Sequence, residues 1–493
     1  MSTEKDVEVP RPPYADRVGA FALSKKPRTK RANGANGSIA LATADQGPPV
    51  DRRAEIVEEL NQEYALVMVG GGVAILREGT DAEGRFEYRL LSVDAFREKL
   101  RPQKEFINDK PVPHASIWLN DGRRREYDGI VFAPGLETPR FYNLWRDTEI
   151  VPNPRGAEGC PLFLDHLFHN VCRGEDALFA WVMGWFASIF QFPRAKTGNA
   201  LVLRGAQGAG KTIVGQIIGA LLGRHYTLAG DPRFVTGRFN AHLANCLLLQ
   251  LDEATWGGDH VATGKLKDLI TGDTQMIEFK GKEPITVKNY VRLMISSNND
   301  WVVPAGLEER RFATLDIGEE QMQNASYFRA IMAEQKAGGD GALLHYLRNF
   351  DLSEIDLSQI PRTAALFEQK NASLTPEMSW WLDVLHAAQL PGDRHGEGTS
   401  PVAQLYAAYL EHARNRGVTR RTNETALGIF LRRYVPDLTR RKKVLEPGSS
   451  RRTYCYEFPA LPVCRSAFDR AARTSSAWDT LEEWSSEPST GPP

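Results

Sequence analysis

The eight residues GAQGAGKT, positions 205–212, determine the architecture that we predict for this chain. They match the pattern G-x-x-x-x-G-K-[S/T] in full, from Gly205 to Gly210, Lys211 and Thr212. The apolar segment ALVLR precedes them, and TIVGQIIGALLG, which reads as a helix, follows. Strand, glycine-rich loop and helix in this order predict a phosphate-binding loop.

The chemistry of such a loop explains its composition. Glycines let backbone N–H groups point toward a phosphate without a Cβ clash, and the helix N-terminus adds partial positive charge. We expect Lys211 to contact the β- and γ-phosphates of ATP and Thr212 to bind Mg²⁺. The predicted nucleotide-binding residues are Gly205, Gln207, Gly208, Ala209, Gly210, Lys211 and Thr212.

Polar residues follow two further apolar segments. CLLLQL is followed by Asp252 and Glu253, 40 and 41 residues after Thr212. We expect Asp252 to hold the Mg²⁺ shell, and Glu253 to orient and deprotonate the attacking water. VRLMIS is followed by SNND, so Asn298 is predicted to lie between the other two strands and bind the γ-phosphate or the water, with Asn299 as the alternative.

Two arginines, Arg310 and Arg311, follow this third segment. One or both are predicted to act as an arginine finger, which stabilises the charge of the transferring phosphoryl group. The sequence does not rank the two, and a pair of solvated arginines is the alternative. Because a neighbouring subunit often supplies such a finger, the active site would then belong to a ring. The predicted catalytic residues are Lys211, Asp252, Glu253, Asn298, Arg310 and Arg311.

Hydrophobic patterns divide the rest of the chain into predicted structural segments. Short apolar segments alternating with helices predict an α/β core with a mostly parallel sheet. Upstream, YALVMVGGGVAILRE reads as two strands around a glycine turn, and ALFAWVMGWFASIFQ reads as a core helix containing Trp181, Trp185 and Phe186. Downstream, two amphipathic helices and the hairpin RRKKVLEPGSSRRTYCYEF predict a winged helix.

The predicted organisation follows from these segments. It comprises a disordered N-terminal tail (1–50), a small α+β domain (51–155), a helical collar (156–197), an α/β ATPase domain (198–375), a winged-helix DNA-binding domain (376–470) and a disordered acidic tail (471–493).

Composition narrows the class of protein. The net charge is −1, so nucleic-acid binding would have to come from local basic clusters. The five cysteines form no C-x-x-C pair, which argues against a zinc site or a disulfide framework and favours a reducing compartment. No stretch of about 18 apolar residues is present, so we expect no membrane association. The expected location is the cytoplasm.

The motifs GAQGAGKT, LLLQLDE, a basic hairpin, MISSNN and an Arg pair occur here in the order that resembles superfamily 3 helicases. The similarity is greatest to the helicase half of phage and satellite-phage primase-helicases, and it extends over about residues 55–460. It implies an AAA+ P-loop core, ATP and Mg²⁺ as cofactors, and a homo-oligomeric ring, a hexamer. It also implies movement on single-stranded and forked DNA during replication of a phage, prophage or plasmid.

The resemblance further implies DNA contacts. In that family a hairpin before the sensor strand enters the central channel, which here corresponds to Lys280 and Lys282, with Lys265 and Lys267 as weaker candidates. The C-terminal segment carries twelve Lys or Arg against three acids between 414 and 452, a nucleic-acid footprint. Its predicted DNA-binding residues are Arg420, Arg421, Arg432, Arg433, Arg440, Arg441, Lys442 and Lys443.

The chain also departs from the family pattern. Many relatives carry a primase-polymerase domain upstream, but residues 51–155 are too short for one and contain no convincing D-x-D element. We therefore expect a helicase whose primase or polymerase, if any, is a separate polypeptide. The alternatives are an ATP-dependent initiator or loader that does not unwind processively, and a non-enzymatic DNA-binding regulator.

Overall fold

The computed structural model describes residues 51–486 with short gaps. The gaps are at 83, 232, 238–239, 254–259, 280–282, 301, 304–308, 419–420, 445–449, 451, 473–475 and 477. The described residues from Ile56 onward belong to one compact unit, and every site discussed below lies in it. The tail predicted for residues 1–50 lies outside the described residues.

The first domain is built on a β-hairpin. Strands β1 (Tyr64–Val69) and β2 (Gly72–Thr80) pair antiparallel as predicted, and Gly70 at their turn has a φ of 59°, which favours glycine. The sheet order is β3-β2-β1-β6, and buried Ile56, Phe96 and Trp118 belong to the core. The other elements are α1 (Arg52–Glu63), β3 (Phe86–Leu91), α2 (Val93–Lys99), β4 (Lys104–Ile107), β5 (Lys110–Pro113), α3 (His114–Asn120), β6 (Glu126–Tyr127), β7 (Ile130–Val131) and β8 (Tyr142–Asn143).

A helical segment leads into the central sheet. Helix α5 (Asp176–Gln191) is apolar on most sides and therefore buried. Trp181, Trp185 and Phe186 are at most 6% exposed, which confirms their predicted place in the core. The shorter elements are the 3₁₀-helix η2 (Gly156–Gly159), α4 (Pro161–Asp165) and the π-helix η3 (His166–Val171).

The central sheet has five parallel strands in the order β10-β11-β14-β9-β15. Its strands are β9 (Ala200–Arg204), β10 (Tyr226–Ala229), β11 (Leu248–Asp252), β14 (Arg292–Ser297) and β15 (Phe312–Asp316). Most of their side chains are buried, as the apolar segments predict. The edge strand β10 was not predicted, because four residues carry too little pattern. Strands β12 (Thr274–Ile277) and β13 (Ile285–Lys288) form a separate antiparallel hairpin, as predicted.

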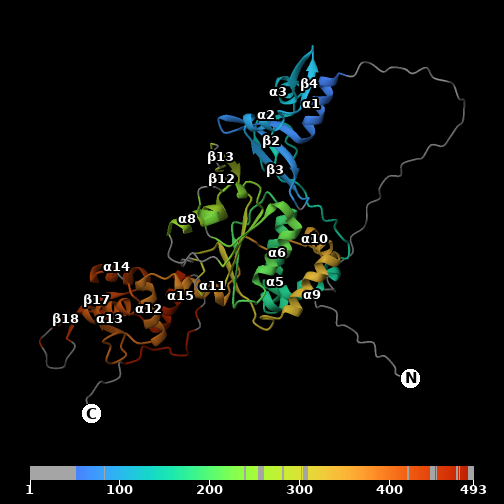
Figure 1. Cartoon of the computed structure of the whole chain (residues 1–493). Helices are drawn as coiled ribbons and strands as arrows, with labels where there is room; N and C mark the ends of the chain where they lie inside the picture. The colour runs from blue at the N-terminus through green and yellow to red at the C-terminus, as the bar shows by residue number, and fades with distance from the viewer. Residues whose placement is uncertain are drawn as a thin grey trace, which may run out of the picture. The chain divides into compact units, whose positions relative to one another are not determined.

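Helices surround this sheet. Helix α6 (Lys211–Leu222) packs against β10, β11 and β14 (Figure 1). The remaining helices of the region are η4 (Gly223–His225), α7 (Arg233–Thr236), η5 (Ala241–Leu243), α8 (His260–Thr271), α9 (Ala325–Glu334), the π-helix η6 (Gln335–Gly339), α10 (Asp340–Arg348) and α11 (Ala364–Ala372). Within the part of the chain that the structure describes, no helix is both long enough and apolar enough to cross a membrane.

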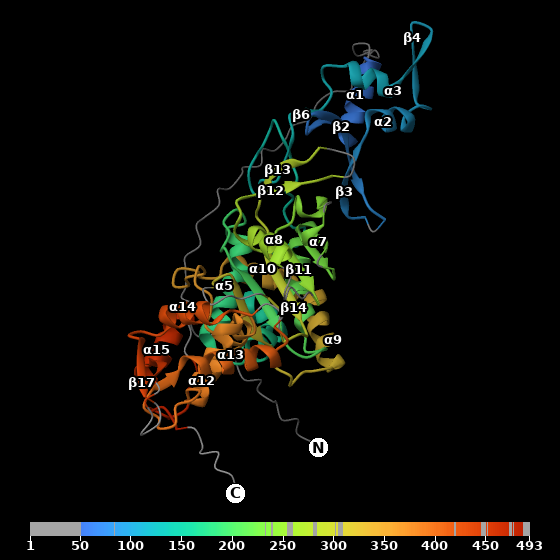
Figure 2. The ribbon, with the colours of Figure 1, turned by 90° about the vertical axis from the view of Figure 1, so that its left-hand side faces the viewer.

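The C-terminal domain contains helices and a small antiparallel sheet, grouped together in both views (Figures 1 and 2). The sheet order is β16-β18-β17. Helices α13 and α14 and the pair β17–β18 match the predicted helices and hairpin. The elements are α12 (Pro376–Ala387), β16 (Thr399–Pro401), α13 (Val402–Asn415), α14 (Glu424–Tyr434), β17 (Thr439–Val444), β18 (Arg452–Glu457) and α15 (Leu461–Ala472).

The acidic tail differs from its predicted disorder. Trp484 is 7% exposed, and its indole donates to the Pro459 carbonyl over 2.9 Å. Trp478 donates to Asp469 over 2.8 Å. Both indoles gain an apolar surface and a hydrogen-bond acceptor on the C-terminal domain, and these gains offset the cost of ordering the chain. The described part of the tail is therefore folded, although its acidic composition indicates disorder.

Candidate functional site

The loop that follows β9 adopts a conformation that depends on glycine. Gly205, Gly208 and Gly210 have φ values of 152°, 81° and 95°. A Cβ at Gly210 would lie 2.6 Å from the ring of Phe328 and 2.7 Å from that of His166, closer than packing allows. Helix α6 begins directly after this loop, so its free N–H groups and its positive dipole end face the same space.

Lys211 lies over this loop. Its side-chain nitrogen donates to the carbonyls of Gly205 and Ala206 at 2.8 and 2.7 Å, and the residue is 6% exposed. Burial lowers the pKa of Lys211, while Asp252 and Glu253 oppose that shift. The loop carbonyls therefore hold the ammonium group of Lys211 in place. A bound phosphate would take over these two hydrogen bonds.

Thr212 and Asp252 meet where β11 ends. The Thr212 hydroxyl donates to both carboxylate oxygens of Asp252, at 3.1 and 3.0 Å. Oxygen ligands of this kind suit Mg²⁺, which binds with one or two carboxylates and takes its other ligands from water and phosphates. The two residues fit the predicted Mg²⁺ site.

Glu253 and Asn298 lie together because β11 and β14 are adjacent. The Asn298 amide donates to Glu253 Oε1 over 3.5 Å, whereas Asn299 turns back to Ser297. The structure therefore favours Asn298 over Asn299. Glu253 has a φ of 56°, held by a backbone hydrogen bond to Ser296. This conformation is unfavourable for a residue with a Cβ, and such strain clusters at functional sites.

Gln250 is a site residue that our sequence analysis missed. It is fully buried in β11, and its amide donates to the Thr212 carbonyl and the Ser296 hydroxyl, both at 3.2 Å. Its oxygen accepts from Tyr226 over 2.5 Å. Gly215 allows this close approach, since a Cβ there would lie 2.1 Å from the Gln250 side chain. One glutamine within the apolar strand LLLQL was the available signal.

The π-helix η3 contributes two further residues that sequence reasoning missed. Asn170 donates to the Ala209 carbonyl over 2.8 Å, and its own carbonyl accepts from Gly318. His166 is fully buried, with Nε2 3.4 Å from the Gly210 carbonyl. Burial lowers the pKa of His166 to about 4, and the hydrogen bond to Gly210 only partly opposes this. The back of the loop is thus held by a segment about 40 residues upstream.

Arg310 and Arg311 lie at the other end of the sheet. The Arg311 carbonyl accepts from Ala200 at the amino end of β9, whereas the phosphate loop follows the carboxyl end of the same strand. The strand length separates the two by about 13 Å. Arg311 and Lys267 each form a 3.2 Å ion pair with buried Glu309. Arg310 is exposed, and no ion pair joins it to another described residue.

The lysines predicted to bind DNA in the central region differ in where the structure places them. Lys280 and Lys282 lie outside the described residues, although the flanking strands β12 and β13 pair as expected. Lys265 is exposed on α8. Lys267 is partly exposed, but it forms an ion pair with Glu309, so its charge is already balanced within the chain. This weakens Lys267 as a DNA contact.

The C-terminal domain displays most of its predicted basic residues on the surface. Arg420 lies outside the described residues. The exposed arginines on α14 and in the loop before it are Arg421, Arg432 and Arg433.

Strand β17 presents its cations on two faces. Arg440 and Lys442 lie over the ring of Tyr454, at 4.4 and 4.8 Å from its centroid, and Tyr454 is 47% exposed. The alternate residues pair with Glu457 at 3.2 and 2.8 Å: Arg441 and Lys443. One face therefore keeps both positive charges beside an exposed ring, whereas the single carboxylate of Glu457 offsets one of the two charges on the other. Only the first has the character of a nucleic-acid surface.

This chain is similar to several known proteins. A family model described as "Family of unknown function (DUF5906)" matches residues 203–311, from the end of β9 to Arg311. The chain is 22% identical over 264 residues to the DNA primase-polymerase of Nitratiruptor phage NrS-1. That similarity covers 50% of this chain but only 36% of the phage protein.

The similarity to solved structures covers more of this chain. The apo structure of the NrS-1 C-terminal region matches with a TM-score of 0.58 and 15% identity, covering 83% of this chain and 100% of that one. Its A form matches with a TM-score of 0.58 and 15% identity, over 82% and 99%. At this identity the comparison shows a shared fold.

Proposed function

We propose that this chain is an ATP-driven DNA helicase that acts in the replication of a phage, prophage or plasmid. One observation carries the proposal: the carboxyl ends of β9, β11 and β14 bring together the loop with Lys211, the pair Thr212–Asp252 and the pair Glu253–Asn298. Phosphoryl transfer requires a phosphate cradle, a metal site and a group that positions water. Adjacent strands supply all three here. An AAA+ core of the superfamily 3 type is part of this proposal.

ATP binding would use groups that are already in place. The N-terminus of α6 and the loop N–H groups would hold the phosphates, and Lys211 would exchange its two carbonyl partners for phosphate oxygens. Thr212 and Asp252 would hold Mg²⁺, which neutralises charge on the β- and γ-phosphates. Gln250 fixes the first turn of α6 against β11 and β14, so it acts as a positioning residue.

Hydrolysis would then depend on Glu253. Its carboxylate would accept a proton from the water that attacks the γ-phosphorus, while the bond to the bridging oxygen of ADP breaks. Asn298 would hold Glu253 and the water in line. The positive charge opposite the leaving group would come from a second copy of the chain, since Arg310 lies at the far end of its own sheet. A ring, a hexamer in our proposal, supplies such a neighbour to every subunit.

DNA contact would use two regions. Lys280 and Lys282 follow β12 and precede β13 in the sequence, and they lie outside the described residues. The winged-helix arrangement that we propose for the C-terminal domain exposes Arg440 and Lys442 beside Tyr454. Phosphate neutralisation by such cations gives binding that is independent of sequence and sensitive to salt.

The relatives support the part of this proposal that concerns DNA replication. The matched phage protein is named a DNA primase-polymerase, so a role in phage DNA replication is consistent with the similarity. The structural match is to its C-terminal region, and this chain spans 36% of its length. We therefore propose an enzyme that acts in the same replication setting.

The test is ATP-dependent strand displacement on forks with a 3′ or a 5′ tail. We expect wild type to hydrolyse ATP and unwind a fork. Lys211→Ala should lose hydrolysis by about 10³-fold or more, because it removes the charge that meets the phosphates. The double variant Lys280→Ala/Lys282→Ala should hydrolyse ATP without unwinding.

The other outcomes distinguish the alternatives. Hydrolysis by wild type without unwinding of either fork would favour an initiator or loader. Equal hydrolysis in wild type and Lys211→Ala would contradict the nucleotide site itself. DNA binding without any hydrolysis would leave the non-enzymatic regulator.

A further inference from the structure

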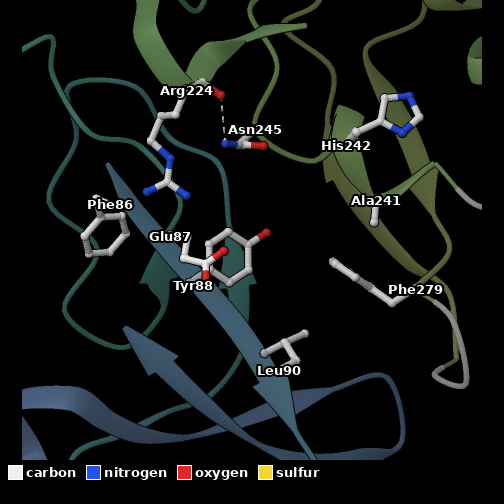
Figure 3. A pocket seen from close by; sticks show the side chains of 9 residues that line it. All are labelled: Phe86, Glu87, Tyr88, Leu90, Arg224, Ala241, His242, Asn245 and Phe279. Atoms are coloured by element: carbon white, nitrogen blue, oxygen red, sulfur yellow. Dashed lines mark hydrogen bonds between the residues drawn. The ribbon is translucent and has the colours of Figure 1, made fainter. Parts of the chain in front are cut away.

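A cavity of about 510 Å³ lies against strand β3 (Figure 3). Side chains alternate along a strand, so Phe86, Tyr88 and Leu90 share the side that lines it. The facing wall includes Arg224 and Asn245, which follow helix α6. Figure 3 shows the Arg224 guanidinium pointing toward Phe86 and Tyr88. Within the described residues, β3 is the edge strand of its sheet.

This cavity is separate from the loop at residues 205–210. Helix α6 begins at Lys211, beside the loop, and ends at Leu222, two residues before Arg224. Twelve helical residues span about 18 Å. The cavity and the ATP site therefore lie at opposite ends of one helix.

Two arginines contact the Phe86 ring but differ in their hydrogen bonds. Their guanidinium carbons lie 5.1 Å from the ring centroid for Arg146 and 4.7 Å for Arg224. Arg146 donates to Glu78 and to two backbone carbonyls. Arg224 Nε is buried without a hydrogen-bond partner among the described residues, and its guanidinium carbon lies 5.6 Å from the Tyr88 ring. Leaving a buried N–H group without a hydrogen-bond acceptor is costly, and an anion in the cavity would offset that cost.

The remaining lining indicates what kind of anion fits. Tyr88 and Phe279 offer aromatic faces for a planar group, and Asn245 supplies an amide next to Arg224. Glu87 also lines the cavity, but it pairs with Arg89 over 2.6 Å, which limits its repulsion of an anion. The volume is in the usual range of small-ligand sites. A planar group joined to an anion is the chemistry of a nucleotide.

We propose that this cavity binds one nucleotide, with its base against Tyr88 and Phe279 and its phosphate at Arg224. The nucleotide would be free or one residue of a single strand, since both present the same base and phosphate. A strand bound here would contact the chain at the far end of the helix that starts at the ATP site. The inference takes from the proposed function only that the chain acts on nucleic acid.

Binding assays without ATP test this inference on the full chain. The probes are fluorescein-labelled dT4, which is short enough to report one site, and unlabelled dTMP as competitor. We expect Arg224→Ala and Tyr88→Ala each to weaken dT4 binding about tenfold, the scale of one lost base stack or phosphate contact. Arg101→Ala, which removes an exposed charge from the same small domain, should bind as wild type does. Competition by dTMP would identify a free nucleotide as ligand, and its absence would identify a strand.

Photocrosslinking covers the case in which a variant does not fold. Wild-type chain crosslinked to dT4 that carries 5-iododeoxyuridine should yield adducts on Tyr88 or Phe279. Adducts only elsewhere, or wild-type affinity in folded Arg224→Ala and Tyr88→Ala, would overturn the inference. Lys211→Ala should keep this binding, so loss of ATP hydrolysis and failure of the cavity site are distinguishable.

Discussion

The two ends of the central parallel sheet differ in how many of their polar and charged side chains have a partner within the chain. At the carboxyl end, the predicted catalytic side chains pair with one another: Thr212 with Asp252, and Asn298 with Glu253. At the amino end, Arg311 is held by Glu309, while Arg310 is exposed and has no ion pair within the described residues. One end thus holds an assembled site, and the other presents an exposed arginine.

This difference teaches how a site can be divided between copies of one chain. Arg204 lies at the assembled end, but Asp316 and Glu368 already hold it in ion pairs. The available arginine is about 13 Å away along the same sheet. A strand cannot shorten to close that distance, so a second copy is the direct way to bring Arg310 to the loop. The predictions below test this division, beginning with the largest effect.

The largest expected effect is on Arg310. Arg310→Ala should reduce ATP turnover by about 10³-fold, the scale of a lost arginine finger. Arg311→Ala should reduce turnover less than tenfold but lower the melting temperature, because it leaves buried Glu309 with one cation fewer. Steady-state phosphate release and thermal unfolding of both variants measure the two effects.

Mixing two inactive variants tests whether the arginine acts between copies. Lys211→Ala retains Arg310, and Arg310→Ala retains Lys211. A mixed assembly therefore contains interfaces in which both groups are intact, and turnover should recover. No recovery, in samples shown to exchange subunits, would mean that both groups act within one chain or that Arg310 is not the finger.

The next effect concerns the assembled end. Glu253→Gln keeps the shape and the contact with Asn298 but removes the group that accepts a proton. Turnover should fall by about 10²-fold or more, while the affinity for a fluorescent ATP analogue stays close to that of wild type. The control is Glu309→Gln, the same change at the amino end, which should lower stability more than turnover. Equal turnover in Glu253→Gln and wild type would remove Glu253 as the base.

These residues show what sequence alone predicts. The loop, the acidic pair and Asn298 each follow an apolar strand, and parallel strands end at a common edge, so local patterns were sufficient to predict their meeting. The hairpin β1–β2 and the helices of the C-terminal domain were predicted for the same reason. Arg310 and Arg311 look equivalent in sequence. Only the position of Glu309 separates them.

Other parts depended on contacts between distant segments. His166 and Asn170 support the loop from about 40 residues upstream, where the sequence shows only a helical, aromatic segment. Gln250 is one polar residue in a buried strand, and its partners come from two other elements. Trp484 packs on the C-terminal domain, although the composition around it indicates disorder. In each case the tertiary packing, which has no local signature, determines the outcome.

The smallest expected effect also lies at the carboxyl end, in the buried His166 behind the loop. Burial lowers its pKa to about 4, so the folded chain keeps it neutral where an unfolded chain would protonate it. The unfolded state then binds more protons below about pH 6.5, and stability falls as the pH drops toward 4. Between pH 7.5 and 5.0 the free energy of unfolding should fall by about 2 kcal/mol more in wild type than in His166→Gln. Denaturant unfolding at the two pH values measures this, with the exposed His395→Gln as control. If His166→Gln and wild type lose the same stability, protons reach His166 in the folded state, and the packing behind the loop is looser than the contacts with Gly210 indicate.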